Sequence, residues 1–248
     1  MLFSPLEQFE INTIIPFYIG FIDISITNLS LYLLIVISIY YFVASYLLSS
    51  FNIIPKAYQI VVESIYDFVY GIVYENLTKK SSLFFPILLT LFCYIVTINL
   101  LGMIPYSFTP TSHVGIAFGL SFSFFIGFTL IGIYEHRDDY LNNFFPDQTP
   151  YEMSPLLVPI EIISHISKAF SLGIRLFANM MSGHTLLKII SGFSWNMFLH
   201  GGLLSIAGLI PFFVLFALVS LETGIAILQG YVFTVLVTLY INDSINLH

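Results

Sequence analysis

The sequence predicts an all-α integral membrane protein, and two observations carry that prediction. Hydrophobic residues make up 58% of the 248 residues and charged residues only 8%, whereas about a quarter of the residues in soluble domains are charged. The apolar residues also gather in runs long enough to cross the roughly 30 Å hydrocarbon core of a bilayer as helices. These runs leave no room for a soluble domain, so residues 1–248 are interpreted as one membrane domain.

About five of the runs are predicted to cross the membrane. They cover residues 29–49, 84–104, 114–134, 156–192 and 203–241. The first three match the ~20 residues that a spanning helix needs. The last two are much longer and must tilt, bend or break, so we expect a long tilted hairpin with its turn near residues 193–203. Pro211 is a candidate bend in the second arm.

Residues 56–76 carry a different pattern, in which polar and apolar side chains take opposite sides of a helix. The polar side chains recur at steps of three and four: Lys56, Gln59, Glu63, Asp67, Tyr70 and Tyr74. The apolar side chains fill the other side: Ile60, Val61, Ile65, Phe68, Val69 and Ile72. This pattern predicts one amphipathic helix that lies in the membrane interface rather than across it.

Lysine and arginine residues set the predicted orientation, because they gather on the inner side of membranes. If residues 29–49 cross inward, Lys56 lies inside, and the later crossings return the chain inward at Arg137. The first 28 residues and the outer loop 105–113 contain neither Lys nor Arg. We therefore expect the N-terminus outside and the C-terminus inside, with no signal or transit peptide.

Arg175 is the most informative residue, because a guanidinium at bilayer depth costs from roughly 3 to 17 kcal/mol. The polar residues of its segment share one helical face: Glu161, His165, Lys168, Arg175, Asn179 and Ser182. Glu161 lies about 21 Å away along a helix, which is too far for an ion pair. A partner for Arg175 must therefore come from another helix or another chain.

His184 and Glu222 form a second candidate pair. His184 follows Arg175 by half a turn in angle, so it points away from the face of the arginine. Glu222 is the only ionisable residue within 215–228, and Gln229 follows it on roughly the same face. In an antiparallel hairpin His184 and Glu222 could meet, and such a pair can relay protons.

Each of these residues also has a structural interpretation. A membrane histidine can be a structural hydrogen bonder, and Glu161 and Asp243 can be helix-end acids at the interface. Asn179 and Gln229 can hydrogen-bond between helices. Glu222 fits such an interpretation least well, because an isolated carboxyl in an apolar run is costly.

Several kinds of site are absent from the sequence. There is no HExxH, no pair of cysteines, no close histidine cluster, no Gly-rich phosphate loop and no nucleophile elbow, so we expect no metal and no cofactor. The single cysteine, Cys93, is interpreted as packing. Seven Lys and Arg residues without a basic cluster give no basis for nucleic-acid binding.

Three blocks of the sequence resemble subunit a of mitochondrial F-type ATP synthases. They are SLGIRLFANMMSGH at 171–184, LETGIAILQGYVF at 221–233 and NLLGMIPYS at 99–107. The order of His184 before Glu222 is similar to the mitochondrial arrangement. The opening residues 4–10 are similar to fungal members, which suggests that Met1–Phe3 are removed.

The resemblance implies a long hairpin packed against a rotating ring of c subunits, each with one membrane-buried carboxyl. Arg175 would keep a passing carboxyl ionised and block a direct leak between two offset proton half-channels, and arginine suits this because it does not deprotonate. The outer half-channel, on the intermembrane-space side, would be lined by His184, Glu222, Asn99, Asn179 and Gln229. The inner, matrix-side half-channel would be lined by Glu161 and Asp243, while Lys168 would snorkel to the inner interface.

The resemblance further implies a stator subunit without nucleotide chemistry of its own, in the mitochondrial inner membrane. Its N-terminus would lie in the intermembrane space and its C-terminus in the matrix. Its partners would be the c-subunit ring, the peripheral stalk, other membrane stator subunits and the lipid bilayer.

Three other classes of protein fit the sequence less well. A secondary transporter with an anionic substrate at Arg175 would carry inverted repeats, and none is visible. A quinone-linked haem subunit would have paired histidines on neighbouring spans, whereas His165 and His184 share one segment. A purely structural scaffold would have no need for Glu222.

Overall fold

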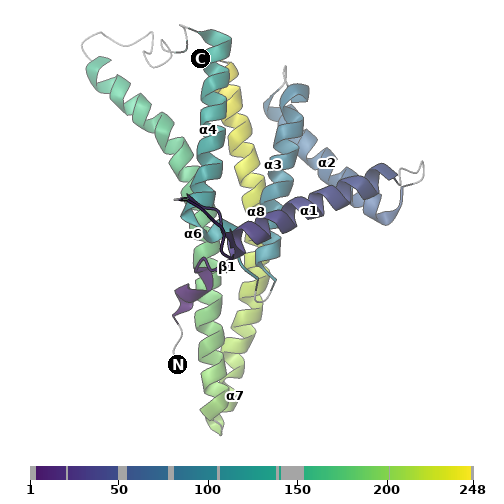
Figure 1. Ribbon diagram of the computed structural model, residues 1–248, viewed down its shortest axis with the longest axis vertical. Coiled ribbons are helices and arrows are strands. Elements are labelled where there is room, and N and C mark those ends of the chain that lie inside the picture. The colour runs from purple at the N-terminus through teal and green to yellow at the C-terminus, as the bar shows by residue number, and fades with distance from the viewer. Residues whose placement is uncertain are drawn as a thin grey trace. The chain divides into compact units, whose positions relative to one another are not determined.

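The computed structural model describes residues 4–20, 22–49, 55–77, 81–104, 107–137, 140, 154–200 and 202–246. Most of them are helical (Figure 1). The α-helices are α1 (Asn28–Ser49), α2 (Ala57–Asn76), α3 (Ser81–Gly102), α4 (Val114–His136), α6 (Ser154–His200), α7 (Leu203–Ala207) and α8 (Leu209–Ile245). Two short 3-10 helices are η1 (Pro5–Phe9) and η2 (Pro110–Ser112). The prediction of an all-α membrane fold is confirmed in this respect.

Four short strands precede α1 and were not predicted. β1 (Thr13–Ile15) pairs antiparallel with β4 (Ile26–Thr27), and β2 (Tyr18–Ile19) pairs with β3 (Ile22–Asp23). Gly20, at φ 63°, supplies the left-handed backbone next to the inner pair, a conformation that glycine adopts without steric cost. Strands of two or three residues are too short to show an alternating pattern in the sequence.

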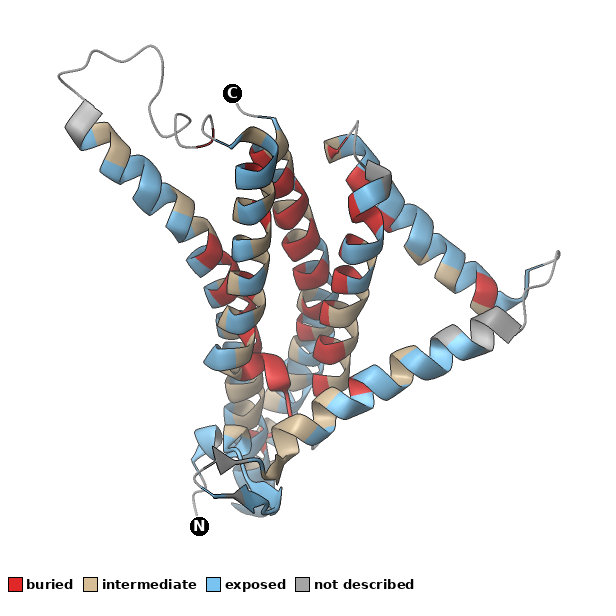
Figure 2. Ribbon diagram, turned by 45° about the horizontal axis from the view of Figure 1, so that its top comes forward, coloured by how far each residue is buried: buried red, intermediate tan, exposed pale blue. Residues whose placement is uncertain are grey.

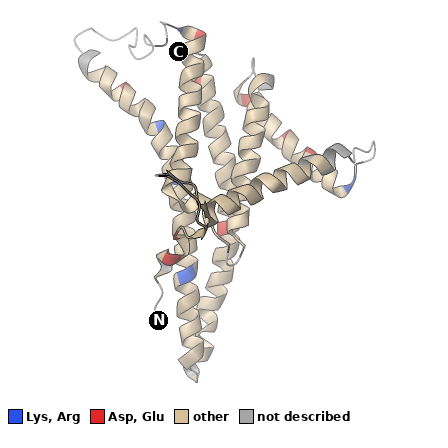
Figure 3. Cartoon of the chain, in the orientation of Figure 1, with Lys and Arg blue, Asp and Glu red and all other residues tan. Residues whose placement is uncertain are grey.

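Four helices of the described part of the chain are long and apolar enough to cross a membrane. They cover Leu83–Gly102, Val114–His136, Leu156–His200 and Ser205–Ile245. The first predicted crossing, 29–49, corresponds to α1, whose apolar run in the described residues is shorter and covers Asn28–Val43. The total number of crossings therefore stays a prediction. Charged side chains are sparse along all these helices (Figure 3).

The two long segments differ from their predicted bounds. α6 continues to His200 instead of ending at residue 192, and the second arm consists of the short α7 followed by α8. Pro211 was expected to bend this arm, but it lies in the first turn of α8. A proline fits there because the amide groups of the first turn have no partner within the helix.

α2 has almost the predicted extent, and its C-terminal half packs on α3. Val69, Ile72 and Val73 are buried, and the ring of Tyr66 meets Phe85 of α3 edge-on at 4.7 Å between centroids. Ile60 in the N-terminal half is exposed, as expected of an apolar side chain directed toward lipid. The interfacial position of α2 stays a prediction.

Contacts divide the chain into two units. Unit 1 consists of Met1–Pro55, Tyr94–His113 and Phe177–Gln229, and unit 2 consists of Lys56–Cys93, Val114–Leu176 and Gly230–His248. Each unit therefore holds one part of α3, of α6 and of α8. Buried residues (Figure 2) include Ile95, Ile98 and Met180 in unit 1, and Leu88, Phe233 and Val237 in unit 2.

The parts of α6 and α8 run antiparallel within each unit. In unit 1 the Ser194 hydroxyl donates to the Gly208 carbonyl oxygen at 3.3 Å, next to the turn between the arms. In unit 2 Lys168 and Asp243 meet at 3.5 Å. The predicted hairpin is thus present in unit 1, and in unit 2 the first part of α6 contacts the last part of α8.

Candidate functional site

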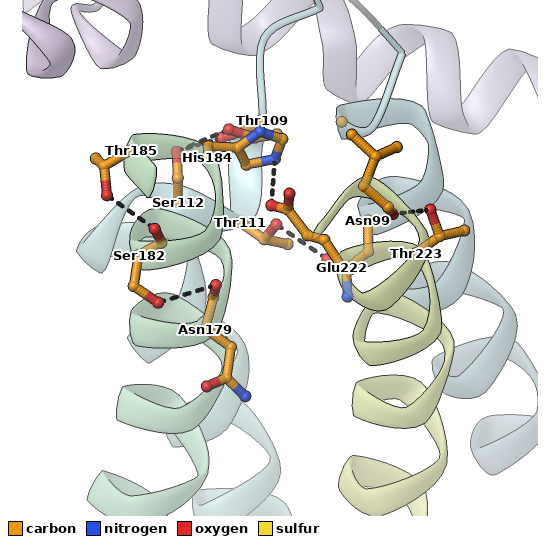
Figure 4. Close-up of polar contacts among 12 residues, drawn as sticks. Asn99, Thr109, Thr111, Ser112, Asn179, Ser182, His184, Thr185, Glu222 and Thr223 are labelled. Carbon is orange, nitrogen blue, oxygen red and sulfur yellow. Dashed lines mark hydrogen bonds and ion pairs between the residues drawn. The ribbon is translucent and has the colours of Figure 1, made fainter. Parts of the chain in front are cut away.

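His184 of α6 and Glu222 of α8 face each other in unit 1 (Figure 4). The distance from His184 Nε2 to Glu222 Oε1 is 3.8 Å, and the Glu222 residue is only 4% exposed. Neither carboxylate oxygen of Glu222 has a hydrogen-bond partner among the described residues. The prediction that these side chains meet in a hairpin is confirmed. A buried carboxyl with an imidazole as its neighbour is an arrangement that can pass a proton.

Gly183 makes this close approach possible. A Cβ atom at residue 183 would overlap Glu222 Oε1 and lie 2.8 Å from its Cδ. Since real Cβ contacts are not this short, any side chain at this position would push the carboxyl group aside. The glycine in the SGH segment therefore leaves free the space that the Glu222 carboxyl group occupies.

We expect Gly183→Ala to destabilise the protein by about 1–3 kcal/mol, the usual cost of forcing extra atoms into a packed site. Gly192→Ala is the matched control, because it lies in α6 and a Cβ there meets nothing within 4 Å. Alanine is the better helix former, so the control should be neutral or stabilising. Thermal denaturation of the purified protein measures both, and equal midpoints for the two variants would contradict the close approach.

Asn99 of α3 is fully buried in unit 1 and connects two other elements. Its Oδ1 accepts a hydrogen bond from the Thr111 hydroxyl at 3.0 Å, and its Nδ2 donates to the Ala226 carbonyl oxygen at 3.4 Å. Ala226 lies one turn after Glu222 in α8. The structure therefore places Asn99 against the part of α8 that carries the buried carboxyl.

Asn179 and Gln229 also form a direct pair in unit 1. Asn179 Nδ2 donates to Gln229 Oε1 at 3.1 Å. Gln229 is buried, at 3% exposed, whereas Asn179 is exposed. All five residues that the resemblance assigns to the outer half-channel thus lie in unit 1. Two pairs of them are in direct contact: His184 with Glu222, and Asn179 with Gln229.

The segment 107–113 was not singled out from the sequence, and it carries three buried hydroxyl groups. Thr109, Thr111 and Ser112 are 4%, 1% and 4% exposed. The Ser107 hydroxyl donates to the Leu101 and Gly102 carbonyl oxygens at 2.7 and 2.8 Å, which satisfies the C-terminal end of α3. Threonine and serine in a loop carry no periodic signal, so the sequence alone does not reveal that these hydroxyl groups are buried.

His113 closes this segment and stacks on Phe108 at 5.1 Å between ring centroids. Its Nε2 is buried without a hydrogen-bond partner among the described residues. Burial lowers the pKa of His113 from its ordinary value of 6.5, because desolvation disfavours the charged imidazolium. The imidazole is therefore neutral at neutral pH.

This shift predicts that acid loosens the segment. The folded pKa lies below the unfolded one, so the stabilisation is complete above pH 6.5 and decreases as the pH falls below that value. Hydrogen exchange of amides 107–113, corrected for the intrinsic rate, should therefore lose protection in acid. His113→Phe keeps the stacking and should remove this pH dependence. The exposed His200 supplies a matched His200→Phe control, which should leave it unchanged; acid-insensitive protection in the wild type would refute the prediction.

Arg175 lies in the part of α6 that belongs to unit 2, and its side chain is half-buried. Leu172 and Leu176 beside it are buried, and Gly173 lets α6 approach α4 so closely that a Cβ there would meet Ser121 Oγ at 2.7 Å. Among the described residues of unit 2, no carboxylate forms an ion pair with Arg175. The structure thus agrees with a guanidinium that the described residues of its own unit do not neutralise.

Glu161 and Asp243 line one small polar cavity of about 60 Å³ in unit 2. Its other lining residues are Phe128, Tyr140, His165, Lys168, Tyr240 and Ser244. A cavity of this size has room for ordered water. The two acids assigned by resemblance to the inner half-channel therefore share one polar space.

Lys168 lines this cavity and contacts side chains of α8 there. Its Nζ lies 3.5 Å from Asp243 Oδ2 and 5.2 Å from the centre of the Tyr240 ring. His165 Nε2 lies 3.4 Å from the Tyr140 hydroxyl on the same cavity. His165 and Lys168, which lie on one face of α6, therefore have partners on other segments, and helical spacing alone does not reveal these partners.

No group of three or more metal-binding side chains occurs in the part of the chain that the structure describes.

Comparison with known proteins points to one family over nearly the whole chain. The family described as ATP synthase A chain matches residues 28–242. ATP synthase subunit a of Marchantia polymorpha is 49% identical over 99% of both chains.

Two further relatives carry the same description. The subunit a of Chondrus crispus is 50% identical over 99% of this chain and 97% of its own. The fungal one of Mycosarcoma maydis is 38% identical over 100% of this chain and 99% of its own. The three resembling blocks therefore lie within a similarity that extends from end to end.

Proposed function

The chain belongs to the ATP synthase subunit a family, and on that premise we propose that it is the proton-translocating stator subunit of a mitochondrial F-type ATP synthase. As a member of this family it is a multi-pass membrane subunit that assembles with other ATP synthase subunits. In the proposal it has no nucleotide chemistry of its own. It lies in the mitochondrial inner membrane, with its N-terminus in the intermembrane space and its C-terminus in the matrix.

The observation that carries the proposal is the half-buried Arg175 without an ion pair in the described part of unit 2. A fixed positive charge with no resident partner can attract a carboxylate that arrives on another subunit and then leaves. A ring of c subunits, each with a buried carboxyl, supplies such partners in turn. At an effective dielectric constant of 20 the attraction at 4 Å is about 4 kcal/mol, which is enough to keep the arriving carboxyl ionised.

Two polar regions give protons access to the ring in this proposal. On the intermembrane-space side, Glu222 and His184 receive protons, with Asn99, Asn179 and Gln229 lining the route. On the matrix side, Glu161 and Asp243 release them through the water-sized cavity that both acids line.

The order of residues in α6 supports this division. The inner-side residues Glu161 and Lys168 precede Arg175, and the outer-side residues Asn179 and His184 follow it. The arginine thus stands between the two routes along one helix. A proton cannot pass a permanently charged guanidinium directly, so it must travel with the ring.

Isolation of the intact complex tests the proposal. The chain should co-migrate with c subunits, the peripheral stalk and a nucleotide-binding sector in native gels. Vesicles that contain the complex should synthesise ATP when an acid-to-base step drives protons through it. Recovery of the chain in a complex without c subunits, or ATP synthesis that does not depend on the proton gradient, would refute the assignment.

A further inference from the structure

We propose that Thr111 is a positioning residue of the outer proton route: its hydroxyl orients the Asn99 side chain, which in turn fixes the turn of α8 that follows Glu222. The inference rests on the proposed function, because it assigns a role within that route. Neither the sequence patterns nor the resemblance pointed to Thr111. All residues involved belong to unit 1.

The chemistry of the Asn99 amide fixes the direction of both hydrogen bonds, and Figure 4 shows the one with Thr111. The Ala226 carbonyl can only accept, so the amide atom that faces it at 3.4 Å is Nδ2. The same amide then presents Oδ1 to Thr111 at 3.0 Å. An amide oxygen can only accept as well, so the Thr111 hydroxyl must be the donor. Without that donor, Asn99 has no described partner for its oxygen.

The chain of bonds is buried, which makes it important for the orientation of Asn99. Thr111 is 1% exposed, and Asn99 and Ala226 are both 0% exposed. Bulk solvent therefore does not reach the amide oxygen. A buried acceptor left without a donor carries its full desolvation cost, so the amide would turn away if the Thr111 hydroxyl were lost.

Thr111 differs from most hydroxyl-bearing residues of the chain in what it binds. Thr90, Thr129 and Thr185 each donate to a carbonyl oxygen three residues earlier in their own helix. Such bonds satisfy the hydroxyl group but do not connect the helix to another element. Thr111 donates instead to a side chain on α3, from the separate segment η2.

The residues next to Thr111 in the sequence are themselves held in place by local contacts. Thr109 Oγ1 donates to Ser112 Oγ at 3.1 Å, and Ser112 Oγ donates to the Thr109 carbonyl oxygen at 2.6 Å. Gly102 at the end of α3 lets Thr109 sit where a Cβ would otherwise be. These contacts hold the residues on both sides of Thr111, and thereby the backbone that carries its hydroxyl group.

The test compares Thr111→Val with Thr111→Ser in the complete ATP synthase complex in vesicles. Valine keeps the branched shape and removes the hydroxyl, so proton-driven ATP synthesis per assembled complex should fall about tenfold. Serine keeps the donor and should retain at least about half of the rate. The rate of the valine variant should also respond less to the acidity of the outer compartment.

Controls separate positioning from general damage. Thr90→Val removes a hydroxyl that bonds only its own helix in α3, and it should leave the rate unchanged. If Thr111 acts through Asn99, then Thr111→Val should add no further loss in an Asn99→Leu background. Should the valine variant not assemble, Thr111→Ser and Thr111→Ala, which differ by the hydroxyl alone, decide the same question.

The results of these experiments distinguish a failure of the inference about Thr111 from a failure of the proposed function. Absence of proton-driven synthesis in the wild-type complex would overturn the proposed function itself. An active wild type in which Thr111→Val, or Thr111→Ala beside Thr111→Ser, works normally would overturn the inference alone. Additive losses in the Asn99→Leu background would show that Thr111 does not act through Asn99 and would overturn it too.

Discussion

Replacing Arg175 by alanine is expected to abolish proton-driven ATP synthesis in a complex that still assembles. Without the guanidinium, a ring carboxyl is no longer held ionised as it passes, and the attraction lost is about 4 kcal/mol, or about a thousandfold in rate. The two proton routes would also lose the charge that separates them. The measurement is ATP synthesis by vesicles after an acid-to-base step, together with passive proton leakage, which should rise.

Two further variants give this prediction its controls. Arg175→Lys keeps a positive charge, but a desolvated lysine can release its proton whereas arginine cannot, so synthesis should fail there as well. Lys56→Ala removes an exposed charge before α2 and should have no effect. Normal proton-driven ATP synthesis by an assembled Arg175→Ala complex would contradict the proposed role of the arginine.

Glu222→Gln is expected to slow ATP synthesis by about one to two orders of magnitude, less completely than loss of Arg175. Glutamine keeps the size of the side chain but cannot give up a proton, so His184 at 3.8 Å loses its exchange partner. Proton transfer by a positioned side chain is worth about a hundredfold or more, and bypass through water limits the loss. Turnover measured against outer pH checks the prediction.

The matched control for this variant is Glu75→Gln, which makes the same chemical change at an exposed position of α2. It should leave both the turnover and its pH dependence as in the wild type. Glu222→Asp keeps the acid on a shorter side chain and should recover part of the rate. An unchanged pH profile in Glu222→Gln would remove Glu222 from the proton route.

The sequence contains enough information to predict the helices and part of the site. Apolar runs of spanning length identify α3, α4, α6 and α8, because no other backbone satisfies its polar groups in lipid. The meeting of His184 with Glu222 follows once a turn is expected between the two long arms, since the turn sets which residues face each other. That contact is confirmed by the structure.

Other features could not be predicted, for identifiable physical reasons. Helical spacing gives the direction in which Lys168 points but not which segment meets it there, so its contact with Asp243 was not foreseen. The hydroxyl groups of segment 107–113 were missed because threonine and serine in a loop carry no periodic signal. The strands around Gly20 are too short for alternation to appear.

The half-buried position of Arg175, which forms no ion pair among the described residues, also bears on how the protein is made. A newly inserted chain has no ring carboxyl beside it, and a guanidinium at bilayer depth costs roughly 3 kcal/mol or more. On the proposed function, docking of the c-ring removes this penalty, so the charge that works in the finished motor also disfavours the solitary subunit. On that function, assembly with the ring is therefore energetically favoured over persistence of the solitary subunit in the membrane.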